Sequence, residues 1–245
     1  MELESRPITT LASRIGRSFV DLIYPPSCAV CGIATRREGD FCAACVQTLP
    51  GRSGPACPRC ARRLGPHLDG RSACSRCPPA LRRLEGVLAA ASYEGSVRDL
   101  IHRLKFRGER SLAFPLGRLI GATVRAASVR PSIVVPVPLH WRRRMARGYN
   151  QAELLADVVA RDLGVSCRRR AIRRTRPTLP QSRLGGVGPR ARNVRDAFAP
   201  RSRGLSGATI LIVDDVLSTG ATLSQCALAL RQGGAGTVTG AVVAR

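Results

Sequence analysis

Eight cysteines arranged as four Cys-x-x-Cys pairs dominate the first third of this 245-residue chain. The pairs are Cys28/Cys31, Cys42/Cys45, Cys57/Cys60 and Cys74/Cys77. One pair offers two thiolates to a tetrahedral metal ion, and two pairs close a four-thiolate site of the kind that holds structural zinc. Such a site has no open coordination position, so it stabilises a fold and performs no catalysis. The pattern therefore predicts two structural zinc ions.

Redox motifs and disulfides explain the cysteine pattern less well than zinc does. Redox motifs would not recur as four evenly spaced copies, and disulfides are disfavoured in a reducing compartment. Sequential pairing is the simplest arrangement, and an interleaved cross-brace stays open as the alternative. In the sequential arrangement one ion is bound by Cys28, Cys31, Cys42 and Cys45, and the other by Cys57, Cys60, Cys74 and Cys77.

Residues 24–80 contain few large aliphatic side chains, so a unit of this size needs its metal to fold. Structural zinc supplies on the order of 10 kcal/mol of folding free energy. We expect a double zinc ribbon over 24–80. The two remaining cysteines, Cys167 and Cys226, are interpreted as parts of a strand and of a helical core stripe.

The chain is strongly basic, with 40 Lys and Arg residues against 16 Asp and Glu residues and a formal net charge of +24. Only one of the basic residues is a lysine, Lys105. A charge of this size indicates polyanionic ligands, which are phosphate esters, nucleic acid or an anionic surface.

The N-terminal segment, residues 1–23, is amphipathic and does not resemble an export signal. Glu2 and Glu4 stand where a signal peptide has basic residues, and Arg14, Arg17 and Asp21 interrupt the apolar stretch that follows. No run of the sequence approaches the roughly 18 apolar residues of a membrane span. We therefore expect no membrane span and a cytoplasmic protein.

From about residue 82 the sequence alternates between strand-like and helix-like segments. Strands are predicted at 86–93, 132–139, 167–175, 208–215 and 237–245, and helices at 97–104, 111–127, 151–163 and 222–234. The basic stretch 140–148 and the Pro-, Gly- and Arg-rich stretch 174–192 are predicted to be loops. Apolar strands alternating with helices predict an α/β domain over 82–245, with a mostly parallel sheet covered by helices on both faces.

The stretch ILIVDDVLSTGAT, residues 210–222, ends a buried strand with two carboxylates and a small polar turn. Ligands of parallel sheets bind beyond the carboxyl ends of the strands. The amides of the turn and the hydroxyls of Ser218, Thr219 and Thr222 can bind one phosphate, and Gly220 allows a close approach. Asp214 and Asp215 suit the vicinal hydroxyls of a sugar. A helix cap with incidental acids explains one Asp and one Ser but not the whole string.

The stretch VDDVLSTGAT resembles the 5-phosphoribosyl-1-pyrophosphate (PRPP) motif of type I phosphoribosyltransferases. Other stretches are similar to the ComF family (ComFC/GntX-like proteins), in which a double zinc ribbon precedes a type I phosphoribosyltransferase domain. The similarity runs from about residue 20 to the end, and the loop departs from the family pattern at GGVGP, before Arg190. The similar stretches are YPPSCAVCG, FCAACVQTLP, LIHRLKFRGER, VPVPLHWRRRMARGYNQAELLA and RTRPTLPQSRLGGVGPRARNVRDAF.

The resemblance implies a role for each matching residue. Asp214 and Asp215 would bind the ribose hydroxyls, directly or through Mg²⁺, and Lys105 would contact a phosphate. The 5′-phosphate would be bound by Ser218, Thr219, Gly220, Ala221 and Thr222. Candidates for the pyrophosphate are Arg142, Arg143, Arg144 and Arg147, because a guanidinium matches its charge. The loop would close over the substrate and bring Gln181, Arg190 and Asn193 near it.

Two classes of function follow from this resemblance. The first is a Mg²⁺-dependent phosphoribosyltransferase whose acceptor the sequence does not identify, linked to DNA uptake and competence. The second is a non-catalytic PRPP sensor or single-stranded-DNA-binding protein of the uptake machinery. The scarcity of aromatic residues argues against an extended base-stacking groove. A weaker hypothesis makes the zinc module a docking surface for a helicase-like partner.

Overall fold

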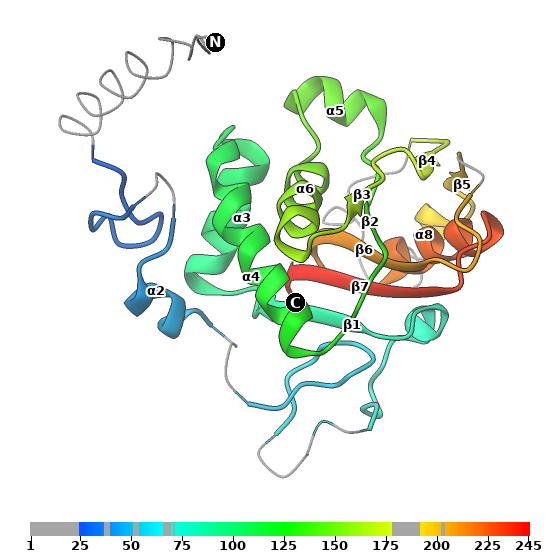
Figure 1. Ribbon diagram of the computed structural model, residues 1–245, viewed down its shortest axis with the longest axis horizontal. Helices are drawn as coiled ribbons and strands as arrows, with labels where there is room; N and C mark the ends of the chain where they lie inside the picture. The colour runs from blue at the N-terminus through cyan, green and yellow to red at the C-terminus, as the bar shows by residue number, and fades with distance from the viewer. Residues whose placement is uncertain are drawn as a thin grey trace, which may run out of the picture.

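A five-stranded, fully parallel sheet forms the centre of the computed structural model (Figure 1). The structure describes residues 25–36, 40–50, 54–65, 70, 72–177, 192–201 and 204–245. The predicted N-terminal amphipathic segment 1–23 lies outside the described residues. In spatial order the strands are β1 (Val87–Ala91), β7 (Thr237–Ala244), β6 (Thr209–Val216), β2 (Ile133–Pro136) and β3 (Ser166–Cys167).

Helices cover both faces of this sheet, as predicted. On β6, Ile210 and Ile212 point to one face, where α8 (Ala221–Gln232) packs, while Leu211 and Val213 point to the other. Successive side chains of a strand alternate between faces, so a strand buried on both sides must be apolar throughout. The second face is covered by α3 (Gly95–Phe106), α4 (Ala113–Ala126) and α6 (Gln151–Leu163).

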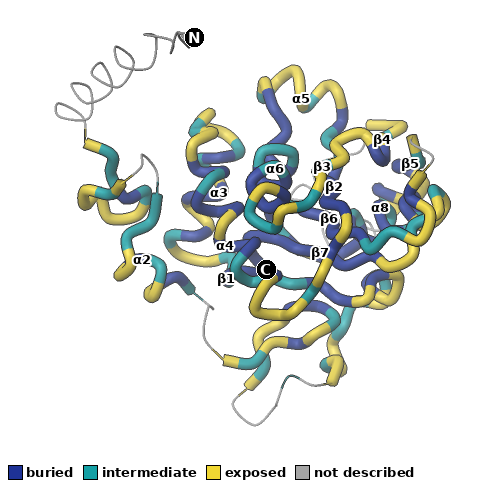
Figure 2. The backbone as a smooth tube through the Cα atoms, viewed as in Figure 1, coloured by how far each residue is buried: buried dark blue, intermediate teal, exposed yellow. Residues whose placement is uncertain are grey.

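The basic stretch 140–148 is a helix, α5 (Trp141–Arg147), and the prediction of a loop was wrong. His140 caps its start, because the ring Nδ1 accepts a hydrogen bond from the amide of Arg142 at 3.3 Å. Gly148 ends it in the left-handed conformation, with φ of +80°. Figure 2 shows α5 as a mostly exposed element at the edge of the molecule. Arginine favours helices, so a helix with no buried face is possible here.

The stretch 167–175 is not one strand, which corrects a second prediction. Its first residue ends β3 in the main sheet, and β4 (Ile172–Arg174) pairs antiparallel with β5 (Phe198–Pro200) in a separate two-stranded sheet. A turn at Arg168–Ala171 separates β3 from β4, with the Ala171 amide donating to the Arg168 carbonyl at 3.3 Å.

The cysteine-rich region forms two small units that pack on different parts of the α/β domain (Figure 1). The first unit includes α2 (Ala43–Thr48), and Leu49 at its end is buried in the same core cluster as α3. The second unit leads through the 3-10 helix η1 (Pro79–Arg83) into β1. The domain limits 24–80 and 82–245 stay predictions. Buried side chains from both sides of this boundary belong to the same two core clusters.

Candidate functional site

A cavity of about 480 Å³ lies at the carboxyl ends of β2 and β6. After β2 the chain moves outward to β3, and after β6 it moves in the opposite direction to β7, so the two strands flank the point where the strand order reverses. Ligands of α/β sheets bind at such a point. The lining residues that carry polar side chains are Tyr93, Lys105, Arg143, Arg147, Asn150, Gln151, Arg174, Asp214, Asp215, Ser218, Thr222 and Arg245.

The 218–222 loop joins β6 to α8 and forms one wall of this cavity. Ser218, Gly220 and Thr222 line it, whereas Thr219 and Ala221 are buried behind the wall. The Thr219 hydroxyl accepts a hydrogen bond from the Ala221 amide at 3.5 Å and so helps to start α8. Gly220 has a φ of +77°, a conformation that glycine adopts without strain. The turn therefore presents helix N-terminal amides to the cavity, which is a favourable place for an anion.

Asp215 is held by two side chains from different elements. Lys105 Nζ of α3 lies 2.9 Å from Asp215 Oδ1, and the Gln151 side-chain amide at the start of α6 donates to Asp215 Oδ2 at 2.7 Å. Arg147 of α5 donates in turn to the Gln151 side-chain carbonyl. Asp215 is only 4% exposed, so both of its oxygens are engaged in a nearly dry site.

Asp214 has a different environment. Burial, with the neighbouring Asp215 carboxylate, raises the pKa of Asp214 to about 7. One Asp214 oxygen accepts the Asp215 amide at 2.9 Å. Burial alone would lower the pKa of Lys105, but the Asp215 and Asp214 carboxylates outweigh it and raise that pKa. The Lys105–Asp215 ion pair thus lies beside a carboxyl group, that of Asp214, which can exchange a proton near neutral pH.

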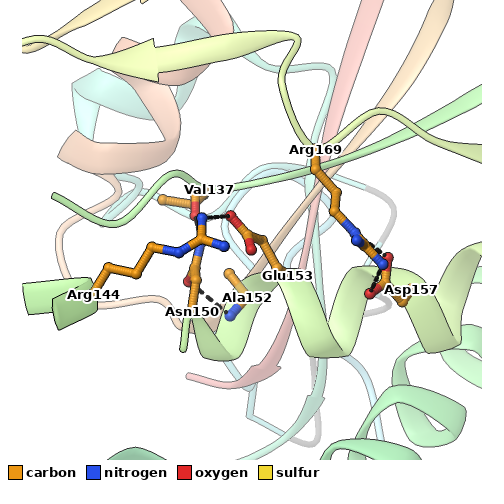
Figure 3. Close-up of polar contacts among 7 residues, drawn as sticks. All are labelled: Val137, Arg144, Asn150, Ala152, Glu153, Asp157 and Arg169. Carbon is orange, nitrogen blue, oxygen red and sulfur yellow. Dashed lines mark hydrogen bonds and ion pairs between the residues drawn. The ribbon is translucent and has the colours of Figure 1, made fainter. Parts of the chain in front are cut away.

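The arginines predicted to bind pyrophosphate divide into two groups. Arg143 and Arg147 line the cavity, whereas Arg142 and Arg144 do not. Arg144 instead forms an ion pair with Glu153 of α6 at 3.0 Å (Figure 3). The Arg142 guanidinium lies over the Trp141 ring, 5.2 Å from its centroid. The periodicity of α5 explains the division, because residues four apart share a helix face.

The cavity contains basic and amide groups that the sequence interpretation missed. Arg174 of β4 lies on its rim, where burial and the nearby Arg143 lower its pKa to about 10. Asn150 caps α6 through its side-chain oxygen and donates to the Val137 carbonyl at 3.0 Å, which ties α6 to the end of β2 (Figure 3). Nothing in the sequence indicated that Arg174 reaches the cavity, because the stretch 167–175 was predicted to be a single strand. Gln151 could have been suspected from its place at the start of a helix beside the strand ends.

The loop residues are only partly described. Gln181 and Arg190 lie outside the described residues, so their approach to the substrate stays a prediction. Asn193 is half-buried and does not line the cavity. Of the described residues of this stretch, Arg174 lines the cavity, whereas 175–177, 192 and 193 do not.

The cysteines form two four-residue groups in the sequential arrangement, Cys28/Cys31/Cys42/Cys45 and Cys57/Cys60/Cys74/Cys77. Four sulfurs bound tetrahedrally at 2.3 Å from one ion lie about 3.8 Å apart. The Sγ–Sγ distance is 3.7 Å for Cys31 and Cys42 and 3.6 Å for Cys60 and Cys74. The donor set and spacing fit zinc in both groups.

Backbone amides favour the thiolate form in each group. The Cys42 amide donates to Cys28 Sγ at 3.4 Å, and the Cys74 amide donates to Cys57 Sγ at 3.2 Å. Burial opposes ionisation, but these and other amide hydrogen bonds lower the pKa values of Cys28 and Cys57 to about 6. A thiolate is the form that binds zinc.

Comparison with known proteins finds a matching domain family, related sequences and a similar solved structure. A family model described as a double zinc ribbon domain matches residues 19–78. The chain is 34% identical over 217 residues to the DNA utilization protein YhgH of Shigella flexneri, covering 86% of each chain. It is 28% identical over 202 residues to competence protein F of Haemophilus influenzae, covering 80% of this chain and 86% of the relative. The structure of a purine phosphoribosyltransferase from Pyrococcus horikoshii matches 53% of this chain and 71% of its own, at 19% identity and a TM-score of 0.33.

Proposed function

This chain belongs to the ComF family, and from that premise we propose that it binds PRPP with Mg²⁺ and transfers the phosphoribosyl group to an acceptor. The observation that carries the proposal is the network of Lys105, Asp215 and Gln151 beside the 218–222 loop. It places an ordered carboxylate next to an anion-binding turn, and a sugar phosphate requires both features.

The 5′-phosphate would lie against the 218–222 loop. The loop amides and the Ser218 and Thr222 side chains provide donors there, and the N-terminus of α8 adds a favourable dipole. Gly220 has no side chain to obstruct the anion. This part of the site needs no metal.

The two aspartates would then have separate roles. Asp215 is already bonded by Lys105 and Gln151 and would accept from a ribose hydroxyl in a fixed orientation. Asp214 would be the group that meets Mg²⁺ or the second hydroxyl, because carboxylate oxygens are the ligands that this ion prefers. When bound, Mg²⁺ would neutralise charge on the pyrophosphate and so make it a better leaving group.

The cavity lining also contains three arginines. These are Arg143, Arg147 and Arg174, and their guanidinium groups can form paired hydrogen bonds with pyrophosphate oxygens. In the reaction the bond between the anomeric carbon and the pyrophosphate oxygen breaks, and the acceptor's nucleophile forms the new bond. Positioning and electrostatic stabilisation of the separating charges would provide most of the rate enhancement.

A calorimetric titration of Mg²⁺ and PRPP into the zinc-loaded protein tests this proposal. We expect binding by the wild type and a loss of ~100-fold or more in affinity for Asp214→Asn/Asp215→Asn, because two charged hydrogen-bonding groups are removed. Asp157→Asn is the matched control, since Asp157 of α6 pairs with Arg169 (Figure 3) and neither residue lines the cavity. No binding by the wild type, or equal binding by the double variant, refutes a PRPP site here.

A second function is favoured by the surface of α5. Trp141 is 58% exposed and Met145 is 75% exposed, one helical turn apart, and Arg142 and Arg144 are exposed beside them. An exposed aromatic ring among arginines suits a single-stranded nucleic acid, which stacks a base on the ring and pairs phosphates with the guanidinium groups. In this alternative the chain is a DNA-binding protein of the uptake machinery that need not turn over PRPP.

A further inference from the structure

We propose that the second cysteine group, Cys57/Cys60/Cys74/Cys77, positions the 218–222 loop, so that zinc in this group controls the order of the loop and through it the affinity for a sugar phosphate, whereas zinc in the first group does not act on the loop. The choice of ligand rests on the function proposed above. The structural coupling itself rests on contacts on both sides of the second group.

The first contact path starts at the last cysteine of the group. Cys77 is followed by Pro78 and Pro79, and η1 begins at Pro79. Proline fixes its own φ angle, so this connection is stiff. The Leu81 amide donates to the Pro78 carbonyl at 3.0 Å, which adds a further constraint. The metal site therefore fixes where η1 begins.

Helix η1 contacts the loop directly. Leu81 is fully buried, and its side chain lies so close to Gly220 that a β-carbon on this glycine would be 2.4 Å from Leu81 Cδ2. Arg83 NH1 donates to the Ser224 hydroxyl in the first turn of α8 at 3.2 Å. The loop and the helix N-terminus that it leads into both rest against η1. Displacing η1 would leave the left-handed turn at Gly220 without its packing partner.

The second contact path leaves the group through Cys60. The Cys60 carbonyl accepts a hydrogen bond from the Arg245 guanidinium, and Arg245 lines the cavity. The main chain of Arg245 is fixed in turn, because its amide donates to the Ala91 carbonyl at 3.1 Å and its carbonyl accepts from the Tyr93 amide at 2.9 Å. Arg245 is thus a positioning residue between the metal site and the cavity.

Burial supports the same conclusion. Cys57 and Cys60 are 1% and 0% exposed and belong to one buried cluster with Leu81, Leu223 and Cys226. Leu223 and Cys226 lie on α8 behind the loop. The second cysteine group therefore packs in the same hydrophobic core that lies beneath the 218–222 loop.

The first cysteine group differs in its contacts. The Ala29 carbonyl accepts from Arg103 NH1 at 2.7 Å, and the Pro50 carbonyl accepts from the Ser92 amide at 2.8 Å. These contacts lead to α3 and to the end of β1. None of the hydrogen bonds and ion pairs seen for the described residues of the first group reaches residues 214–224. The first group is therefore an internal control for the order of the 218–222 loop.

The experiment compares the full-length wild type with Cys74→Ser/Cys77→Ser and Cys31→Ser/Cys42→Ser, each purified and assayed for zinc content. Hydrogen exchange of peptides covering 214–224 and titration with Mg²⁺ and PRPP are the two readouts. Loss of the second zinc is expected to speed exchange in 214–224 and to weaken PRPP binding by about tenfold or more. Loss of the first zinc is expected to leave exchange in 214–224 unchanged, so this readout separates the two variants. Equal effects of the two variants, or no effect of the second, overturn the proposal.

Leu81→Ala covers the case in which the second cysteine variant fails to fold. It retains all eight cysteines and truncates the buried side chain that packs against Gly220. We expect two zinc ions per chain, faster exchange in 214–224 and weaker PRPP binding; unchanged exchange overturns the proposal. If even the wild type does not bind PRPP, the proposed function is wrong, and hydrogen exchange alone then decides whether the second zinc positions the loop.

Discussion

The two adjacent aspartates of the site are chemically different residues. Asp215 has both oxygens bonded, to Lys105 and Gln151, and is nearly excluded from water. Asp214 accepts from the Asp215 amide and has a pKa of about 7 because of burial and the charge of Asp215. Adjacent residues on a strand point to opposite faces, so identical side chains there meet different surroundings. This asymmetry is the basis for assigning proton exchange to Asp214.

The raised pKa of Asp214 predicts that PRPP affinity depends on pH. Below about pH 7 this carboxyl is protonated in the folded protein, and a proton must leave before it can bind Mg²⁺. Affinity should rise with pH up to about 7 and then level off. The measurement is calorimetric titration between pH 5.5 and 8.5. The PRPP phosphates also titrate near pH 6, so Asp214→Asn provides the reference profile.

Stability is expected to change in the opposite direction. The folded state binds this proton more tightly than the unfolded chain, whose Asp has a pKa of 3.8, so this group's contribution to the free energy of unfolding falls as the pH rises from about 4 to 7. Asp214→Asn removes that contribution. For the affinity, identical pH profiles of PRPP binding by wild type and Asp214→Asn would falsify the prediction that Asp214 causes the pH dependence.

At the scale of elements, the conformation of the 218–222 loop depends on the strand before it, the glycine within it and the helix after it. The loop follows β6, α8 begins at Ala221, and Leu81 of η1 fills the space that a side chain at position 220 would need. Replacing Gly220 therefore has two separate effects. One is backbone strain in the left-handed region, and the other is a steric clash with a buried leucine.

Gly220→Ala is predicted to weaken PRPP binding by about tenfold or more, besides the ~1–2 kcal/mol of strain that alanine has in the left-handed region. The control is Gly164→Ala, at the end of α6, where φ is +70° and no atom lies within 4 Å of the added carbon. It should lose stability by a similar strain energy and retain full affinity. Thermal unfolding and PRPP titration of both variants separate the two effects; equal affinities would show that Leu81 does not constrain the loop.

For the whole molecule, the charge of +24 is the main property that favours nucleic acid as a ligand. Lys105, Arg143, Arg147 and Arg174 line the cavity, and the exposed arginines of α5 lie next to it. Helix α5 has no buried residue, so its sequence is not constrained by the core. Among the described residues, no helix is long and apolar enough to cross a membrane.

The DNA-binding alternative predicts a salt-dependent affinity for single-stranded oligonucleotides. Each phosphate neutralised contributes about −0.7 to the slope of log K against log salt concentration for single strands. Arg142→Ala/Arg144→Ala should reduce the slope by about 1.4 if both side chains contact phosphates. The control is Arg161→Ala/Arg231→Ala, which removes two exposed arginines in the last turns of α6 and α8, at the opposite edge of the sheet. Binding that is insensitive to salt, or equally affected by both variants, contradicts a role for α5.

Much of the fold could be predicted because its signals are local. The spacing of the cysteine pairs indicated two four-thiolate sites, and the apolar run before Asp214 indicated a strand buried on both faces. The helix predicted at 151–163 was confirmed as α6. Two errors came from basic stretches. In 140–148 and 167–175, arginines hide the pattern of burial that distinguishes helix, strand and turn, and the capping by His140 was not recognised.

The sequence by itself determined which groups this protein has for chemistry: eight thiols in zinc spacing, an aspartate pair beside an anion-binding turn, and a large excess of arginine. Only the tertiary structure decided which of these groups act together. Arg147 and Arg143 face the cavity while Arg144 pairs with Glu153, Gln151 reaches Asp215, and Leu81 and Arg245 connect one cysteine group to the cavity wall. The physical reason is that sequence periodicity fixes the face of each element, whereas contacts between residues distant in sequence depend on how the elements pack.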